Sequence, residues 1–219
     1  MSCVDKEMSV RGEWKRGFAA LQVQWLKHRL AKACRLLYRM GLVAHAEGNV
    51  SCRVGNDRFL IKITGTPFRA MKPENFVLID EEGDALTQGE PSTEKPLHLE
   101  IYRSISDINF TIHTHPSNVI KVSRMSTEFF QIPKESHAFS LTGDIPIVGP
   151  FPAGSKELAD AAAKALKKAN VRAVILRDHG LVVASPELEE AFDLTVFIEK
   201  VASEKEWSLK HKLEKRKKD

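Results

Sequence analysis

Two histidines separated by one residue, His113 and His115, are the clearest candidates for chemistry in the chain. They lie in the segment NFTIHTH, whose β-branched and aromatic residues predict a strand. Residues i and i+2 of a strand point to the same face, so both imidazoles can reach one cation. The same spacing also suits two ordinary hydrogen-bonded histidines, so the pair alone leaves both interpretations open.

A third histidine, His179, favours the metal interpretation. It follows the apolar segment AVIL at 173–176 and lies in the turn sequence Asp178-His179-Gly180. Functional groups are often placed where a strand ends and a loop begins. Three histidine ligands leave one coordination position for a substrate, as catalytic zinc sites do. Considered alone, His179 is better explained as a turn residue.

The candidate acid or base is Glu94, which lies at the predicted start of a helix that contains Leu97 and Ile101. The helix dipole favours the ionised form of a carboxyl group in this position. Beside a divalent cation, a carboxylate can take a proton from a substrate that the metal has acidified. Without the histidines, Glu94 is equally well explained as an ordinary first-turn helix acid.

Three short segments offer hydroxyl groups or backbone amides to an anion. One precedes a predicted strand, one follows a strand, and one is expected to cap the helix after Glu94. A helix N-terminus adds a favourable field for phosphate. Each segment alone is ordinary turn chemistry, but together they suggest a phosphate site. Its residues would be Gly48, Asn49, Thr64, Gly65, Ser92 and Thr93.

The elements that must position these side chains follow from periodicity. Residues 18–40 are predicted to be a helix that ends at Gly41, because Leu26, Leu30 and Leu37 recur on one face. Further helices are predicted at 116–122, 155–169 (capped by Ser155) and 186–210, and strands at 49–54, 58–64, 73–80, 85–89, 109–115, 145–149 and on both sides of the turn at 178–180. Hairpin-like pairs among these strands predict an α/β fold with three layers, α/β/α, around a mostly antiparallel sheet.

Composition excludes several classes of protein. With 219 residues and 42% hydrophobic content, the chain fits one compact domain. No apolar run reaches the roughly 18–20 residues that span a bilayer, and the start lacks the apolar centre of a secretory signal. Its three cysteines, Cys3, Cys34 and Cys52, form no disulfide framework. We therefore expect a cytoplasmic protein without a membrane partner.

The positive charge is confined to the end of the chain. The net charge is +4, and residues 210–219 alone carry six Lys or Arg and two acids, which is also +4. A neutral body with a basic tail argues against a nucleic-acid partner, since such proteins spread positive charge over a folded face. We expect an N-terminal extension at 1–25, a catalytic domain at 26–208 and a basic, solvated tail at 209–219.

The motifs occur in the order that is typical of the class II aldolase/adducin family, which the chain resembles over roughly residues 26–205. Each motif is weak alone, but the ordered set is specific, and it is most similar to L-fuculose-phosphate aldolases. The motifs are GNVS at 48–51, TGTP at 64–67, STE at 92–94 with the following His98, HTH at 113–115 and DHG at 178–180.

The resemblance implies an enzyme, a class II aldehyde-lyase of carbohydrate metabolism that is usually a cyclic homotetramer. It would cleave a ketose 1-phosphate, such as L-fuculose 1-phosphate, reversibly to dihydroxyacetone phosphate and a small aldehyde. His113, His115 and His179 would hold Zn²⁺, with Mn²⁺ or Co²⁺ as alternatives. Glu94 would be the acid or base and would also approach the metal before substrate binds. The phosphate-binding role falls on the six residues named above.

The chain departs from the family pattern at two places. The usual NHG is DHG here, and the Asp178 carboxylate could act as a hydrogen-bonding partner behind His179. Family members also have catalytic tyrosines, but this chain has only Tyr38 and Tyr102, neither at the expected place. His137 falls near the first missing tyrosine and is either a replacement acid or a surface loop histidine.

Three other functions remain open. An L-ribulose-5-phosphate 4-epimerase would break and remake a bond on the same scaffold, and a dehydratase of a thio-sugar phosphate would use similar groups. A third possibility is an adducin-like interaction domain without catalysis. Relatives of that sort lack the metal histidines, whereas this chain has all three.

Overall fold

The fold is a central sheet between two layers of helices. The computed structural model describes the backbone of residues 3–125, 128–168 and 171–216, and within these ranges the side chains of residues 20–208. The described part contains an eight-stranded sheet with the order β3-β2-β1-β4-β8-β7-β6-β5. The strands are β1 Asn49–Arg53, β2 Phe59–Lys62, β3 Phe76–Ile79, β4 Phe110–Thr114, β5 Phe129–Phe130, β6 Ile145–Val148, β7 Ala173–Leu176 and β8 Gly180–Ser185.

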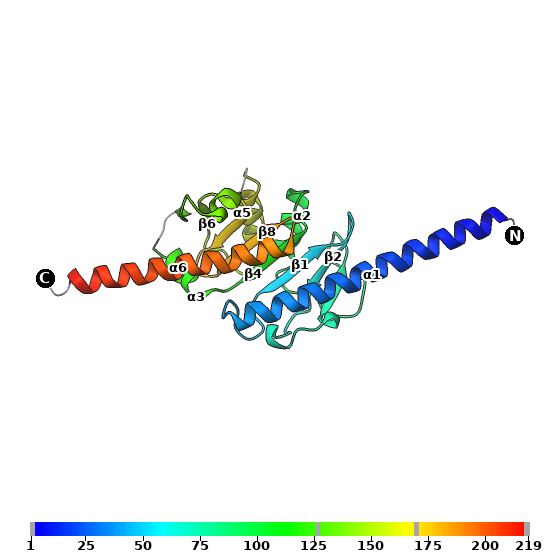
Figure 1. Cartoon of the computed structure of the whole chain (residues 1–219), viewed down its shortest axis with the longest axis horizontal. Helices are drawn as coiled ribbons and strands as arrows, with labels where there is room; N and C mark the ends of the chain where they lie inside the picture. Colours follow the sequence, from blue (N-terminus) through cyan, green and yellow to red (C-terminus); the bar gives the residue numbers. More distant parts are fainter. Residues whose placement is uncertain (1–2, 126–127, 169–170, 217–219) are drawn as a thin grey trace.

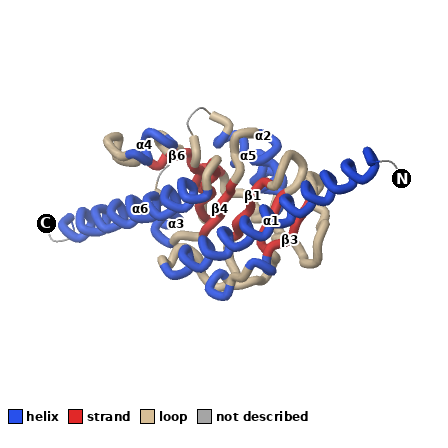
Figure 2. The backbone as a smooth tube through the Cα atoms, turned by 45° about the vertical axis from the view of Figure 1, so that its right-hand side comes forward, coloured by secondary structure: helices blue, strands red, loops and turns tan. Residues whose placement is uncertain are grey.

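Neighbouring strands of the described sheet pair antiparallel except for β6 and β7, which pair parallel. The two long helices and α3 cover one face, and α2 and α5 cover the other (Figures 1 and 2). The predicted three-layer α/β/α fold with a mostly antiparallel sheet is therefore confirmed. The helices are α1 Cys3–Arg39, α2 Lys95–Ser104, α3 Ser117–Ser123, α4 His137–Thr142, α5 Lys156–Leu166 and α6 Leu188–Arg216, with short 3-10 helices at Phe68–Ala70 and Pro73–Asn75.

Alternating side chains of the strands build two separate cores. In β2, Leu60 packs on the α1 side of the sheet, whereas Ile61 packs on the α2 side. In β8, Val183 and Val182 divide in the same way. Successive residues of a strand point to opposite faces, so strands covered by helices on both sides need apolar residues at nearly every position. Polar residues within such strands therefore indicate something other than packing.

The long helices α1 and α6 project beyond the body at opposite ends (Figure 1). Helix α1 begins at Cys3, so it crosses the boundary at residue 25 that the sequence suggested, and its first described buried residue is Leu26. Gly41 has φ +73°, the left-handed conformation that ends many helices, as predicted. The division into extension, domain and tail stays a prediction, and the side chains of the tail lie outside the described residues.

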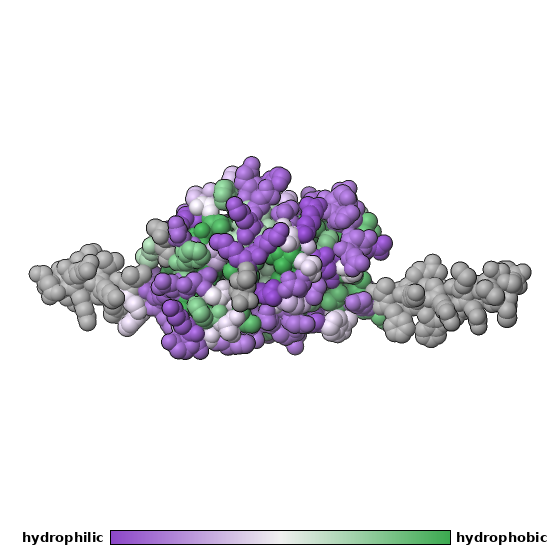
Figure 3. Space-filling model, turned by 90° about the horizontal axis from the view of Figure 1, so that it is seen from above, coloured by the Kyte–Doolittle hydropathy of each residue, from purple (hydrophilic) through white to green (hydrophobic). Residues whose placement is uncertain are grey.

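The body between these two helices presents a surface that is hydrophilic over most of the face in Figure 3, with scattered apolar residues. Such a mixed surface is ordinary for a folded domain. In the part of the chain that the structure describes, no helix combines the length and apolar character needed to cross a bilayer.

Two local predictions were wrong, and two short elements were missed. Residues 85–89 form no strand, and only a single bridge joins Ala85 to Ile79. Neither Ser92 nor Thr93 caps α2, because Glu94 occupies the N-cap position without a side-chain capping bond. The hydroxyl of Ser92 instead accepts a bond from the Glu94 amide (3.3 Å) in the turn before the helix. Strand β5 and helix α4 were not predicted, because their apolar runs are too short to show a period.

Candidate functional site

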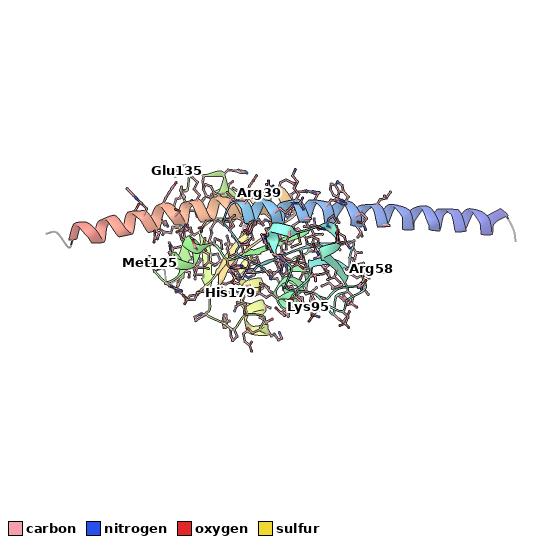
Figure 4. All side chains as sticks on the ribbon, turned by 90° about the horizontal axis from the view of Figure 1, so that it is seen from below. Arg39, Arg58, Lys95, Met125, Glu135 and His179 are labelled. Atoms are coloured by element: carbon pink, nitrogen blue, oxygen red, sulfur yellow. The ribbon has the colours of Figure 1, made fainter. Side chains whose placement is uncertain are left out.

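Strand pairing brings the three histidines together. His113 lies in β4 and His115 directly follows it, while His179 lies in the turn between β7 and β8. Because β4 pairs with β8, this turn lies beside the end of β4. The ring centroids of the three imidazoles are 4.8, 4.9 and 5.0 Å apart. His179 lies within the body, far from the projecting ends of the long helices (Figure 4).

A glycine allows this close approach. A Cβ atom on Gly180 would lie 2.3 Å from the Thr114 carbonyl oxygen and 3.1 Å from Cε1 of His113. Any larger residue would therefore push the turn away from β4 and carry His179 with it. Asp178, just before, has φ +59°, a conformation that Asp and Asn tolerate better than most residues. The Asp of the DHG turn is therefore compatible with the backbone conformation at this position.

Glu94 joins the histidines from the start of α2. Its Oε2 lies 3.2 Å from Nε2 of His113, and its Oε1 lies 3.3 Å from Nε2 of His179. One ligand atom from each of the four residues, including His115, falls within 4.8 Å of all the others. The four side chains therefore form one compact cluster at the end of β4.

The hydrogen bonds behind the rings point lone pairs into the cluster. Nδ1 of His113 lies 3.1 Å from the Leu181 carbonyl oxygen, which can only accept, so Nδ1 carries the hydrogen and Nε2 is bare. Nδ1 of His115 lies 3.4 Å from Oε2 of Glu47, which favours the same tautomer. The Nε2 atoms of His113 and His115 are only 3.0 Å apart. Two lone pairs facing each other at this distance suit a shared cation.

Protonation states agree with this arrangement. Burial and the neighbouring His113 lower the pKa of His115 to about 3, so the ring is neutral near pH 7, as a ligand must be. Burial by itself raises the pKa of Glu94, but the neighbouring imidazoles of His113 and His179 outweigh it and hold that pKa below its usual range. His115 therefore offers a neutral nitrogen to a shared cation, and Glu94 offers a carboxylate.

Two buried polar atoms of the cluster have no hydrogen-bond partner among the described residues, Oε1 of Glu94 and Nδ1 of His179. An unbonded carboxylate oxygen in a buried place costs free energy. A divalent cation at the cluster would compensate the Glu94 oxygen. The donor set of three imidazoles and one carboxylate is the type that holds zinc and related metals, so the residues fit a metal site.

The segments expected to bind phosphate lie beside the cluster. Asn49 is directly opposite His113 in the strand register, and its Nδ2 donates to Oε2 of Glu94 (2.7 Å). Gly48, with φ +74°, lies against β4, because a Cβ there would be 2.7 Å from the His113 carbonyl oxygen. This glycine permits Asn49 to reach Glu94.

Backbone hydrogen bonds hold the other two segments next to each other. The amide of Ser92 donates to the Lys62 carbonyl (3.1 Å), and the amide of Thr64 donates to the Glu90 carbonyl (3.0 Å). Gly65 and Thr93 are exposed, whereas Ser92 is buried. These bonds hold residues 64–65 and 92–93 next to each other, and Asn49 meets Glu94 directly after them. The phosphate role of the six residues stays a prediction.

Sequence reasoning missed Lys62, the last residue of β2. Its side chain is only 2% exposed, and Nζ donates to the Ala46 carbonyl (3.0 Å) just before Gly48. Among the described residues it forms no ion pair with a carboxylate within 4.0 Å, and burial lowers its pKa. A buried cation beside the TGTP loop suits an anion. The signal was available as a lysine in an otherwise apolar strand, FLIK.

Two predicted roles look different in the structure. The Asp178 carboxylate does not contact His179; it pairs with Arg124 (2.5 Å) at the surface, so the expected bond behind the ligand is wrong. His137 is exposed at the start of α4 rather than in a loop, and it lines a cavity of about 440 Å³ with residues of α6 such as Asp193. Within one chain, His137 is not brought to the histidine cluster.

Comparison with known proteins agrees with these features. Residues 28–205 match the family model described as Class II Aldolase and Adducin N-terminal domain. The L-fuculose phosphate aldolase of Methanococcus maripaludis is 32% identical over 78% of this chain and 91% of its own length. The 5-deoxy-D-ribulose 1-phosphate aldolase of Bacillus thuringiensis is 31% identical over 73% of this chain and 74% of its own length.

A solved structure shows the same architecture. The crystal structure of L-fuculose-1-phosphate aldolase from Thermus thermophilus aligns with a TM-score of 0.72 and 25% identity, covering 88% of this chain and 96% of that one. The family model covers most of the chain, and the related sequences span it at similar length. The chain therefore belongs to the class II aldolase and adducin N-terminal domain family, as a member of its aldolase type.

Proposed function

We propose that this protein is a zinc-dependent aldolase that cleaves a ketose 1-phosphate reversibly to dihydroxyacetone phosphate and a small aldehyde. The observation that carries the proposal is the convergence of His113, His115, His179 and Glu94, with ligand atoms within 4.8 Å of one another. Mn²⁺ or Co²⁺ would suit the same donor set. A cytoplasmic location is part of the proposal.

The residues around the cluster support a phosphorylated substrate. Lys62 supplies a buried positive charge, and the segments at 64–65 and 92–93 lie side by side next to it. Fixing the phosphate there would hold the reacting carbons at the histidine cluster and lower the entropic cost of reaching the transition state. The two related enzymes named above act on sugar phosphates, according to their names.

Cleavage breaks the bond between C3 and C4 of the ketose. The electron pair of that bond passes to C3 and gives an enediolate, and the C4 hydroxyl loses its proton as the aldehyde forms. When bound, the divalent ion supplies positive charge that stabilises the developing oxyanion. Glu94 delivers a proton to C3 of the enediolate in this direction and removes it in the reverse direction. Its Oε1, without a hydrogen bond in the described structure, is suited to this transfer.

The second proton transfer needs another group, because the chain lacks tyrosines at the family positions. We assign it to His137. The cavity that His137 lines is also lined by Glu190 of α6, whose carboxylate accepts a bond from Ser185. Ser185 is the last residue of β8, whereas the histidine cluster lies at the first residue, Gly180. His137 therefore cannot reach the histidine cluster of its own chain, and its proposed role requires a second copy of the chain that brings it there.

A homotetramer would meet this requirement. We expect the purified protein to have a mass of four times the 24.6 kDa of the chain, measured by light scattering after size-exclusion chromatography. The mass should remain that of a tetramer at catalytic concentrations. A monomer that cleaves substrate at full rate would remove His137 from the mechanism.

The substrate is tested by a retro-aldol screen with added Zn²⁺, Mn²⁺ or Co²⁺. The substrates are L-fuculose 1-phosphate, 5-deoxyribulose 1-phosphate, L-ribulose 5-phosphate and the thio-sugar phosphate 5-methylthioribulose 1-phosphate, and dihydroxyacetone phosphate is measured by coupled reduction. We expect dihydroxyacetone phosphate from at least one ketose 1-phosphate.

Other products would assign the site differently. A pentulose epimer without cleavage would indicate the epimerase, and loss of water from a thio-sugar phosphate would indicate the dehydratase. Failure with every substrate in spite of bound metal would contradict the aldolase. A non-catalytic, adducin-like role is disfavoured because the chain keeps all three histidines and the carboxylate in one cluster.

A further inference from the structure

A row of buried polar side chains leads from Glu94 into the interior, between β1 and α2. Nδ2 of Asn49 donates to Oε2 of Glu94 (2.7 Å), and Oδ1 of Asn49 is hydrogen-bonded to Nε2 of His98. Nδ1 of His98 lies 2.6 Å from Oγ of Ser51, which in turn lies 2.7 Å from the Tyr102 hydroxyl. All five side chains are buried, and His98 is 1% exposed.

The hydrogens of this row can be arranged in only one direction. An ionised Glu94 can only accept, so Asn49 must turn its NH₂ group to Glu94 and its carbonyl oxygen to His98. His98 must then carry its hydrogen on Nε2, and its bare Nδ1 accepts the hydrogen of Ser51. The Ser51 oxygen is left to accept from the Tyr102 hydroxyl. Every buried donor and acceptor in this part of the row is satisfied, as an interior network requires.

Packing in the core does not explain why these side chains are polar. The β1 residues Asn49 and Ser51 face the α2 side of the sheet, where the neighbouring strand β2 places Phe59 and Ile61 in an apolar core. Buried polar groups often contribute less to stability than apolar residues of the same size would. Their presence in this core therefore indicates a use other than stability. A histidine is also well suited to the place, because its two nitrogens donate on one side and accept on the other. Burial, together with the nearby His113, lowers the pKa of His98 to about 3, which keeps this neutral form at physiological pH.

We propose that His98 is a positioning residue that, acting through Asn49, fixes the orientation of the Glu94 carboxylate. The Nε2 hydrogen of His98 prevents the Asn49 amide from flipping, and the Asn49 NH₂ group then holds Oε2 of Glu94. The other oxygen, Oε1, is left without a hydrogen bond in the described structure and faces the histidine cluster. The proposal rests on the proposed role of Glu94 in proton transfer.

Losing the hydrogen bond from His98 would allow the Asn49 amide to flip. Without the donor on His98, Asn49 could present its carbonyl oxygen to Glu94, and two acceptors would then face each other. The carboxylate would turn away, and proton transfer would lose its aligned acceptor. Loss of such outer partners of an active-site ligand typically lowers activity by roughly 10–100-fold.

The kinetic test is a double-mutant cycle between His98→Leu and Asn49→Ala in the metal-loaded full chain. We expect His98→Leu to lower kcat by about 10–100-fold and to have no further effect in the Asn49→Ala background, because His98 acts through Asn49. His98→Gln, which keeps an NH₂ donor, should recover a large part of the loss. Equal, additive losses in both backgrounds would overturn the proposal, as would a Gln variant as impaired as the Leu variant.

Thr195→Val is the control for loss of a buried polar group. Thr195 is fully buried in α6, and among the described residues its side chain bonds only its own helix, at the Ala191 carbonyl (2.7 Å). This variant should keep the wild-type kcat. Metal content and unfolding temperature are measured for every variant, and a loss of kcat that simply follows metal loss would assign His98 a structural role and contradict the proposal.

A second measurement does not depend on activity. Nitrogen NMR of the full chain labelled with ¹⁵N-histidine reports which ring nitrogen of each neutral histidine carries hydrogen. We expect His98, assigned by its absence from His98→Gln, to carry hydrogen on Nε2 only, between pH 6 and 8. A hydrogen on Nδ1 would overturn the proposal. If the tautomer is as expected but no substrate is cleaved, the proposed function fails and the arrangement around Asn49 stands.

Discussion

Glu94→Gln is expected to lower kcat by about 10²–10⁴-fold, the usual contribution of a general acid or base. Glutamine has the same shape and can still accept a bond from Asn49, which lies 2.7 Å from the carboxylate. It cannot take or release the proton, so the chemical step fails while the three imidazoles remain in place. Steady-state kinetics with the best ketose phosphate, together with the metal content of the variant, measure this effect.

The matched control for this substitution is Glu100→Gln. Glu100 lies on the same helix α2 and is partly buried, but its carboxylate accepts a bond from Ser104 (3.1 Å) and has no contact with the histidines. It should retain the activity of the wild type. If Glu94→Gln were as active as this control with its metal still bound, Glu94 would have no part in proton transfer.

His113→Ala is expected to reduce metal affinity and kcat/KM by more than the roughly 100-fold that loss of an outer partner causes. His113 contributes a ring that is wholly buried, whose orientation is set by the Leu181 carbonyl. Removing it takes away one nitrogen ligand and leaves the Glu94 carboxylate without its neighbour at 3.2 Å. The dissociation constant for Zn²⁺, measured by competition with a chelating dye, and kcat/KM at saturating Zn²⁺ give the two effects.

His28→Ala serves as the control for general loss of a histidine, because His28 lies on α1 and bonds the Gln24 carbonyl of the same helix. It should bind metal like the wild type. An unchanged Zn²⁺ affinity in His113→Ala would show that the histidine cluster does not hold the ion. Glu94→Gln and His113→Ala thus separate proton transfer from metal binding, since Glu94→Gln keeps all three imidazoles whereas His113→Ala removes one of them.

Much of the fold was predictable because the relevant signals are local. Leu26, Leu30 and Leu37 share one face of α1, and all three are buried. The period of two in extended backbone puts His113, in β4, and His115, just after it, on one face, and the turn at Asp178-His179-Gly180 follows from residue types that favour turns. These features need only short-range information.

What was missed depends on contacts between segments distant in sequence. The hydrogen bond from Asn49 to Glu94 follows from the register of β1 on β4 and from the start of α2. The positioning role of His98 depends on its hydrogen bonds to Ser51 and Asn49 of β1, which are distant in sequence. Asp178 was expected behind His179, but its side chain meets Arg124 from the end of α3. Local sequence does not encode such encounters.

The most direct test of the central claim is the metal content of the purified wild-type chain. The protein is incubated with excess Zn²⁺, dialysed exhaustively against metal-free buffer and analysed by elemental mass spectrometry. The His179→Ala variant is treated in the same way. The arrangement of the three imidazoles and the carboxylate predicts one ion retained per wild-type chain and far less in the variant. A wild-type chain that retains no ion, or a variant that retains as much, would contradict it.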